Sequence, residues 1–160
     1  SHSQVLFKDY NESNIRIIIS EMVELLTARL RANKKQTTVI GFGISYSKEI
    51  NSGFYHSLKL EAPTDSNKEI IKYCNIIFDR YYDYLPIRKV SISCGGLIPK
   101  QGVQLNLFEK YSDILQENEI NKTVDEIKNK FGKNSIIKAS SLLPDSTAIE
   151  RNTKIGGHHE

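Results

Sequence analysis

The sequence predicts an α+β domain in which two helices cover one face of a four-stranded antiparallel sheet. Two observations point to this fold. Two stretches carry apolar residues at helical spacing and four short stretches alternate apolar and polar residues, in the order strand, helix, strand, strand, helix, strand. With 160 residues, of which 39% are hydrophobic, the chain is large enough to bury one ordinary core. We therefore expect one compact domain with an appendage.

The first strand is expected at residues 4–8, and a helix follows it. Asn11 or Ser13 is a suitable N-cap, because either side chain can accept a hydrogen bond from a free backbone N–H group of the first turn. The helix should end near Asn33. Its apolar residues recur with a period close to 3.6 and would form the buried side: Ile15, Ile18, Ile19, Met22, Leu25, Leu26 and Leu30.

Residues 37–46 and 54–60 are expected to pair as a hairpin, with a turn at Asn51-Ser52-Gly53. Apolar side chains occupy every second position of each strand, so each has one apolar side. We expect the second strand to end at Ala62-Pro63-Thr64-Asp65. The inward positions are Ile40, Phe42, Ile44 and Tyr46 on one strand and Phe54, His56, Leu58 and Leu60 on the other.

The second helix should begin at Ser66, because Ser66 and Glu69 form a capping-box pattern, and Pro86 should stop it. Residues 89–94 alternate again and predict the fourth strand, which Gly95-Gly96 closes. This order of elements is the ferredoxin-like split βαββαβ arrangement. The buried stripe of the second helix is Ile70, Ile71, Cys74, Ile77, Phe78 and Tyr81.

The sheet face without helices is the expected place of function, because small polar residues gather there. Glycine inside a strand costs stability, and one use of that cost is to let another backbone approach closely. A nucleic-acid phosphate backbone is one candidate, since serine hydroxyls and lysines hold phosphates; a plain solvated face is the alternative. The outward residues are Val39, Gly41, Gly43, Ser45, Tyr55, Ser57, Lys59, Lys89, Ser91 and Ser93.

A pentapeptide follows the predicted domain and reads Gln104-Leu105-Asn106-Leu107-Phe108. It resembles the motif with which bacterial DNA polymerases and repair proteins bind the ring-shaped sliding clamp. Glutamine offers a donor and an acceptor, and the two leucines and the phenylalanine are apolar anchors for a pocket. The alternative is one more half-buried strand, because Val103, Leu105 and Leu107 alternate with polar residues.

The order of elements and this motif together resemble the little-finger domain and tail of Y-family translesion DNA polymerases, and more narrowly the ImpB/MucB/SamB (UmuC-like) proteins of Gram-positive bacteria. The resemblance runs from Ser3-Gln4-Val5-Leu6 to the segment Val90–Leu97 and the clamp motif. It extends to Ala139–Leu143 and to Ile155–His158. It divides the chain into a DNA-binding domain at 1–97, a linker with the clamp motif at 98–118 and a C-terminal tail with a short helix at 119–160.

The resemblance implies that the chain is the DNA-gripping and clamp-tethering part of an error-prone polymerase that acts in DNA repair and the SOS response. A palm domain upstream would hold Mg²⁺, and this chain would hold no cofactor, no metal and no catalytic site. Gly41 and Gly43 stand where relatives often carry polar or basic residues, which would weaken the grip of that strand. Carried over by position, the DNA-binding residues are Gly43, Ser45, Ser57, Lys59, Lys89, Ser91 and Ser93, and the clamp-binding residues are Gln104, Leu105, Leu107 and Phe108.

In the tail, Thr123 and Glu126 form a second capping-box pattern, which predicts a short helix ending at Gly132. Residues 135–143 are expected to be a strand or an extended arm. A short helix needs a partner surface, which the rest of the polymerase or an accessory protein would supply. His158 and His159 lack further ligands at a suitable spacing, so a plain terminus is expected.

Other functions and surroundings are constrained by composition. The net charge of +3 tolerates a polyanion without requiring one. No apolar run is long enough to span a membrane, and the two cysteines lie in apolar stretches, which favours a reduced, cytoplasmic protein. The chain begins without methionine, so we expect a piece of a longer protein.

A module that binds single-stranded nucleic acid or another protein, as RNA-recognition domains do, is the alternative, although Phe42 would point at the helices instead of the open face. An acylphosphatase-like enzyme lacks a basic phosphate loop after its first strand.

Overall fold

The computed structural model describes residues 1–101 and 111–153 and divides the chain into two units, Ser1–Gly102 and Val103–Glu160. In the first unit the order of elements is the predicted one. It comprises β1 (His2–Tyr10), α1 (Ile15–Ala32), β2 (Lys35–Tyr46), β3 (Gly53–Thr64), α2 (Asn67–Tyr81) and β4 (Ile87–Gly95). A two-residue strand, β5 (Ile98–Pro99), was not predicted and pairs with the start of β2.

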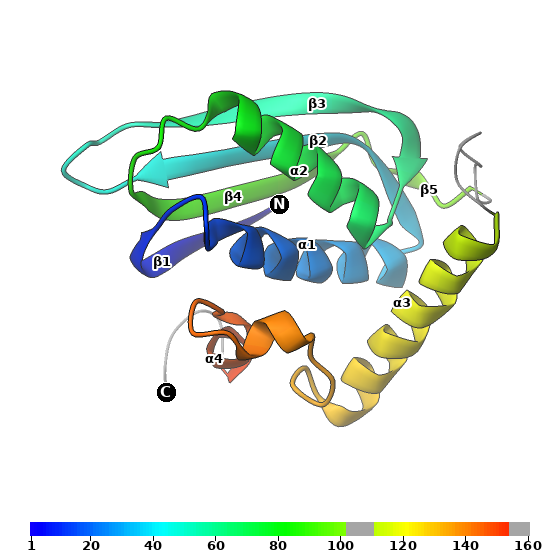
Figure 1. Ribbon diagram of the computed structural model, residues 1–160. Helices are drawn as coiled ribbons and strands as arrows, with labels where there is room; N and C mark the ends of the chain where they lie inside the picture. Colours follow the sequence, from blue (N-terminus) through cyan, green and yellow to red (C-terminus); the bar gives the residue numbers. More distant parts are fainter. Residues whose placement is uncertain (102–110, 154–160) are drawn as a thin grey trace. The chain divides into compact units, whose positions relative to one another are not determined.

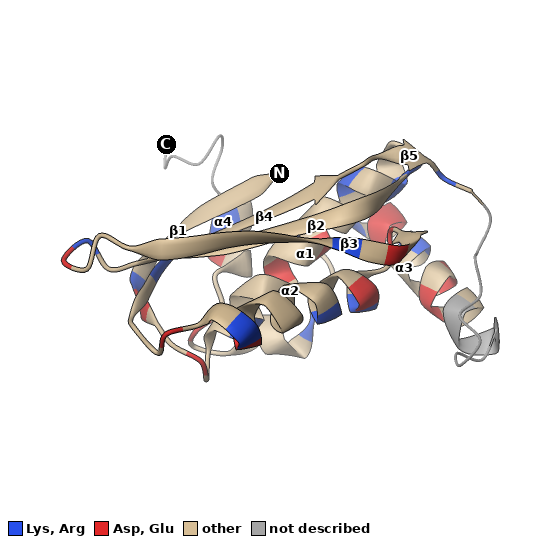
Figure 2. Cartoon of the chain, turned by 90° about the horizontal axis from the view of Figure 1, so that it is seen from above, with Lys and Arg blue, Asp and Glu red and all other residues tan. Residues whose placement is uncertain are grey.

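The sheet is antiparallel, and its strand order is β1-β4-β2-β3. Strand β4 therefore lies between β1 and β2, and β2 lies between β3 and β4. Each strand–helix–strand unit thus has one strand of the other unit between its own two strands, as in the predicted split βαββαβ arrangement. The two helices lie on one face of the sheet (Figure 1), and the edge-on view in Figure 2 shows them on the same side of the strands. The opposite face of the sheet is free of helices of this unit.

The core lies between the helices and the sheet, as the apolar alternation predicted. Phe42 is fully buried and meets Phe78 of α2 edge-on, with ring centroids 6.4 Å apart. Arg16 ties α1 to α2, because its guanidinium donates to Asn75 and pairs with Asp79 at 2.6 Å. The largest fully buried side chains are Phe42, Phe78, Leu6, Ile15, Ile18, Ile19, Met22, Ile40, Ile70, Ile77, Ile87 and Ile92.

Helix α1 begins later than predicted. Its N-cap is Asn14, not Asn11 or Ser13, and the Asn14 side chain makes no capping bond. The Asn11 side-chain oxygen accepts instead from the backbone N–H and the hydroxyl of Ser13. The backbone carbonyl oxygen of Asn11 accepts from the N–H groups of Asn14 and Ile15. These bonds form a turn at residues 11–14, so the helix begins only at Ile15. At α2, by contrast, Ser66 is the N-cap and accepts from the Glu69 N–H group at 3.3 Å, as predicted.

Strand β3 continues through Pro63 to Thr64, where the sequence had indicated an end. It is an edge strand, and an edge position can accept a proline because an outward N–H group needs no partner. The segment after β4 is fastened to the same region. Lys100 pairs with the buried carboxylate of Asp65 at 2.7 Å, and the Gln101 N–H group donates to the side chain of Gln36.

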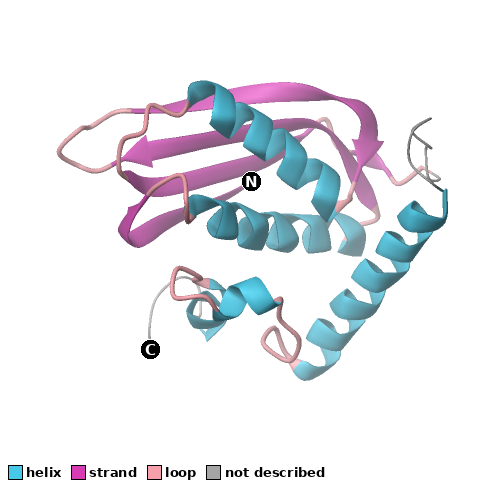
Figure 3. Cartoon of the chain, viewed as in Figure 1, coloured by secondary structure: helices cyan, strands magenta, loops and turns pink. Residues whose placement is uncertain are grey.

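The second unit contains α3 (Tyr111–Phe131), a 3₁₀-helix (Ala139–Leu142) and α4 (Ala148–Thr153), all helical in Figure 3. The predicted helix of the tail is present and ends at Gly132 as expected, but it begins twelve residues before Thr123 and is therefore longer than predicted, with the second capping-box pattern inside it. No Gly or Pro interrupts the sequence between Tyr111 and Gly132, and the helix propagates until Gly132, whose φ of +98° ends it. The strand or arm expected at 135–143 is instead a bend and the 3₁₀-helix.

Candidate nucleic-acid interface

The strand register brings all seven predicted DNA-binding positions onto the open face of the sheet. Gly43 pairs with Ser91, Ser45 with Lys89, and Val39 with Lys59. Gly41 lies between Ser57 on one side and Ser93 on the other. Paired residues of neighbouring strands point to the same face, and the alternate positions Ile40, Phe42 and Ile44 are buried beneath the helices.

Lys59 and Lys89 lie far apart on this face. Both are exposed, and within the described part of the chain neither forms an ion pair. Their partners on β2, Val39 and Ser45, are six positions apart, which corresponds to about 20 Å along the strand. The backbone positions of the two lysines are thus about 20 Å apart along the strands, with the central strand β2 between them.

Gly41 and Gly43 of β2 were expected to let another backbone approach the sheet, but a side chain occupies the space above them. The ring of Tyr55 lies over them: a Cβ atom at Gly41 would stand 2.0 Å from the Tyr55 hydroxyl oxygen, and one at Gly43 would stand 2.8 Å from Tyr55 Cδ2. The space that the glycines leave is therefore filled by a tyrosine of the neighbouring strand. The sequence showed the glycines and the tyrosine but not that the ring crosses the strand to reach them.

Hydroxyl groups of the open face are held by one another. The Tyr55 hydroxyl and Ser93 Oγ are 2.6 Å apart, and Ser91 Oγ donates to Ser3 Oγ at 3.1 Å. Tyr55 remains half exposed, with 54% of its surface accessible. The face between the two lysines is therefore a layer of fixed hydroxyls without charge.

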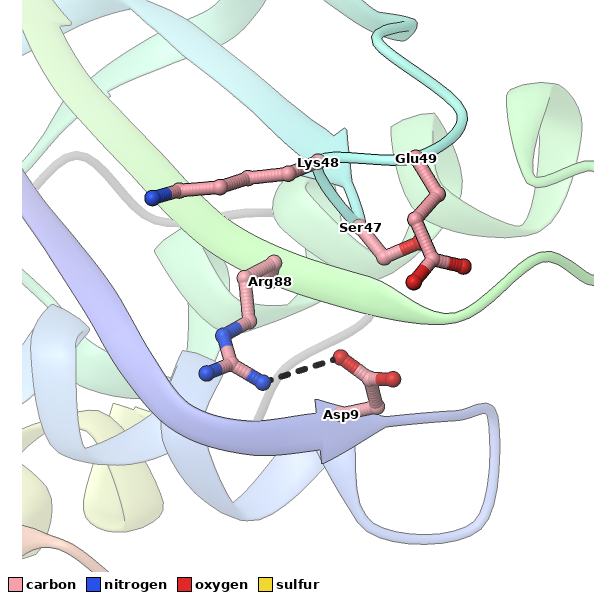
Figure 4. Close-up of a pocket in the computed structure, with 5 residues that line it drawn as sticks. All are labelled: Asp9, Ser47, Lys48, Glu49 and Arg88. Atoms are coloured by element: carbon pink, nitrogen blue, oxygen red, sulfur yellow. Dashed lines mark hydrogen bonds and ion pairs between the residues drawn. The ribbon is translucent and has the colours of Figure 1, made fainter.

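The sequence did not indicate that Lys48 and Arg88 line a pocket at one end of the sheet. A pocket of about 280 Å³ is lined there by Asp9, Ser47, Lys48, Glu49 and Arg88 (Figure 4). Arg88 occupies an irregularity of β4, since one step along β2 from Ser45 to Tyr46 corresponds to two steps from Lys89 to Ile87. No alternation pattern signals such a bulge. The Arg88 guanidinium pairs with Asp9 at 3.1 Å, and with Lys48 and Glu49 the pocket holds two charges of each sign, so it does not favour an anion.

Several alternatives can be placed on the structure. His56 stacks on Tyr81 with ring centroids 3.7 Å apart, which confirms it as a packed residue. Cys74 and Cys94 are free thiols, and burial raises the pKa of each. In the described residues no three His, Cys, Asp or Glu side chains gather to hold a metal ion, and no helix of 1–101 or 111–153 is long and apolar enough to cross a membrane. The clamp motif at 104–108 and the histidines at 158 and 159 lie outside the described residues.

Comparison with known proteins identifies the class to which this sheet belongs. Residues 1–107 match the impB/mucB/samB family C-terminal domain, and the chain belongs to this family. It is 32% identical over 158 residues to UvrX of Bacillus subtilis, whose name refers to UV-damage repair, and 30% identical over 161 residues to a protein of Halalkalibacterium halodurans named DNA polymerase IV 2.

These alignments take in 98% and 99% of this chain but only 38% and 39% of the two relatives. The chain thus spans less than two fifths of the length of the curated relatives that it matches. A solved structure titled "Complex of beta-clamp processivity factor and little finger domain of PolIV" is also similar, with a TM-score of 0.49 and 16% identity over 68% of this chain and 96% of that chain. This similarity is too low to bear on the site.

Proposed function

We propose that the chain is the DNA-gripping and clamp-tethering part of an error-prone translesion DNA polymerase. The observation that carries this proposal is the open sheet face, where Lys59 and Lys89 stand about 20 Å apart without ion pairs to the described residues, and hydroxyls fill the surface between them. Family membership and the names of the polymerase relatives support it.

Such a face suits the backbone of a template-primer duplex. Lysine ammonium groups and serine hydroxyls contact phosphate oxygens whatever the base sequence is. A polymerase needs this kind of contact, because it must hold every sequence that it copies. Binding should be weak, sequence-independent and strongly reduced by salt, since only a few lysines displace counterions.

The experiment is fluorescence anisotropy of a labelled DNA duplex titrated with the chain. The double substitution Lys59→Glu/Lys89→Glu should abolish binding while circular dichroism shows an intact fold. Lys68→Glu/Lys72→Glu is the matched control, because it changes the charge equally on α2, which lies on the opposite face of the sheet. If both double variants lose affinity equally, net charge is responsible and the open face is not the DNA site.

We further propose that residues Gln104, Leu105, Leu107 and Phe108 tether the parent polymerase to the sliding clamp. The proposal is supported by the motif and by its place after Lys100, which is held to Asp65 of the domain. Calorimetric titration of a bacterial clamp should give micromolar binding that Leu107→Ala/Phe108→Ala removes. If neither form binds, the pentapeptide is not a clamp ligand.

The catalytic part would lie upstream in the parent protein. A palm domain there would supply the carboxylates that hold Mg²⁺, and the second unit of this chain would contact the body of the polymerase or an accessory protein. The parent would act in DNA repair in the cytoplasm, where the chromosome of a bacterium lies. The chain alone should therefore bind a primed template without extending it.

Binding of single-stranded nucleic acid is a second candidate, favoured by one observation. Tyr55 is a half-exposed aromatic ring on the open face of β3, and bases of single strands stack on such rings. Phe42, by contrast, points at the helices as predicted. A preference for single strands over duplex in the same anisotropy assay would favour this candidate.

A further inference from the structure

The side chains of Tyr55 and Ser93 form a fixed pair of hydroxyls on the open face. The two oxygens are 2.6 Å apart and come from β3 and β4, on either side of the central strand β2. The pair can form because Gly41 has no side chain: a Cβ atom there would stand 2.0 Å from the tyrosine oxygen and 2.6 Å from the serine oxygen. Aromatic rings that cover glycines of a neighbouring strand are a known way of stabilising a sheet.

The pair lies between the two lysines of the face. Its row of the sheet is that of Gly41, two positions from Val39, the partner of Lys59, and four positions from Ser45, the partner of Lys89. These separations correspond to about 7 Å and about 13 Å along the strand. A backbone that runs from one lysine to the other passes over the hydroxyl pair.

Two hydroxyls that share one hydrogen bond have one donor left. Either oxygen can donate to the other, so one O–H group of the pair is available to an acceptor above the sheet. A phosphodiester oxygen is such an acceptor, and a hydrogen bond to an ionised group is stronger than one between neutral groups. Because the glycines already seat the tyrosine ring, little conformational entropy would be lost on binding.

We infer that Tyr55 and Ser93 together bind one phosphate of the nucleic-acid backbone and so act as an uncharged anchor between Lys59 and Lys89. This inference rests on the proposed function. It adds Tyr55, which is not among the DNA-binding residues that the family resemblance implies, and it gives Ser93 a hydrogen-bond partner on strand β3. It also gives a reason for the glycine at position 41.

The test is duplex affinity measured at several salt concentrations for wild type, Tyr55→Phe, Ser93→Ala and the double variant Tyr55→Phe/Ser93→Ala. Tyr55→Phe keeps the ring over the glycines and removes only the hydroxyl, so the fold should be unchanged. We expect the double variant Tyr55→Phe/Ser93→Ala, which has no hydroxyl left, to bind about fivefold to tenfold more weakly. Each single variant should lose less, because the remaining O–H group can still donate to the phosphate. The slope of log affinity against log salt should stay the same in all three, because no charge is lost. Lys59→Ala or Lys89→Ala should instead lower the slope by about one.

Tyr84→Phe is the matched control, because Tyr84 lies in the connection between α2 and β4 and is well exposed. It should bind as wild type does. Wild-type affinity of Tyr55→Phe/Ser93→Ala would overturn the inference; if Tyr55→Ala then weakens binding, the ring contacts a base and the hydroxyl pair does not hold a phosphate. Failure of the unaltered chain to bind duplex would instead overturn the proposed function.

Discussion

Replacing the glycines of the sheet one at a time tests how the open face is built. A Cβ atom at Gly41 meets only the ends of two side chains, Tyr55 and Ser93, whereas one at Gly43 meets the backbone oxygen of Phe54 at 2.4 Å. At Gly95 the nearest atom, Val39 Cβ, is 3.4 Å away, which is an ordinary contact. The three substitutions to alanine should therefore differ in cost.

The expected costs follow from these distances. Gly41→Ala loses the hydroxyl bond, about 1 kcal/mol, and displaces the ring, while removing glycine from a strand returns about 0.5 kcal/mol or more; we expect a net loss of about 1 kcal/mol. Gly43→Ala must move the backbone of the sheet and should cost at least about 2 kcal/mol. Gly95→Ala should be neutral or stabilise by about 0.5 kcal/mol.

The assay is urea unfolding followed by circular dichroism, since the chain has no tryptophan. In a Tyr55→Ala background the cost of Gly41→Ala should disappear, whereas Gly43→Ala should keep most of its cost because the Phe54 oxygen remains. An equal cost of Gly41→Ala in both backgrounds, or a Gly43→Ala variant as stable as Gly95→Ala, would refute this account of the face.

Three other predictions concern the domain that carries the face. Lys100→Met should destabilise it by about 1–3 kcal/mol, because it leaves the Asp65 carboxylate, only 6% exposed, without its partner. Lys72→Met breaks a longer and more exposed pair with Glu69 and should cost under about 0.5 kcal/mol; equal costs of the two substitutions would contradict this. Burial raises the pKa of the Cys74 thiol in the folded state, so its contribution to stability is complete below the pKa of an unfolded thiol, about 8.5, and is lost as pH rises towards the folded value. This decline in the free energy of unfolding should be about 1.4 kcal/mol per pH unit, and Cys74→Ala should flatten it. An equally steep decline in the variant would mean that Cys74 is not the group responsible. Phe78→Ala should cost about 3–5 kcal/mol in urea unfolding, because the ring is fully buried, and a cost under about 1 kcal/mol would mean that the core is packed differently.

Most of the fold could be predicted because burial imposes a period on the sequence. Ile40, Phe42 and Ile44 alternate along β2, and α1 and α2 keep helical spacing. What failed were the ends of elements. Competing local bonds decide such ends: the turn at Asn11 delays α1, and α3 runs through a pattern at Thr123 that usually starts a helix.

The site was only partly visible in the sequence for a related reason. Alternation assigns residues to a face, and it placed Lys59 and Lys89 together on the open side. It does not show contacts between strands, so the seating of Tyr55 on Gly41 was missed. It also breaks down at a bulge, where Arg88 joins the pocket with Asp9.

The most direct test of the proposed DNA grip is an NMR titration of the ¹⁵N-labelled chain with a short DNA duplex. We predict that amide signals of the open face, such as those of Ser45, Ser57 and Lys89, shift in proportion to bound DNA, and that those of α1 and α2 stay in place. Shifts concentrated on the two helices, or an unchanged spectrum at low salt, would contradict the claim that this face holds DNA.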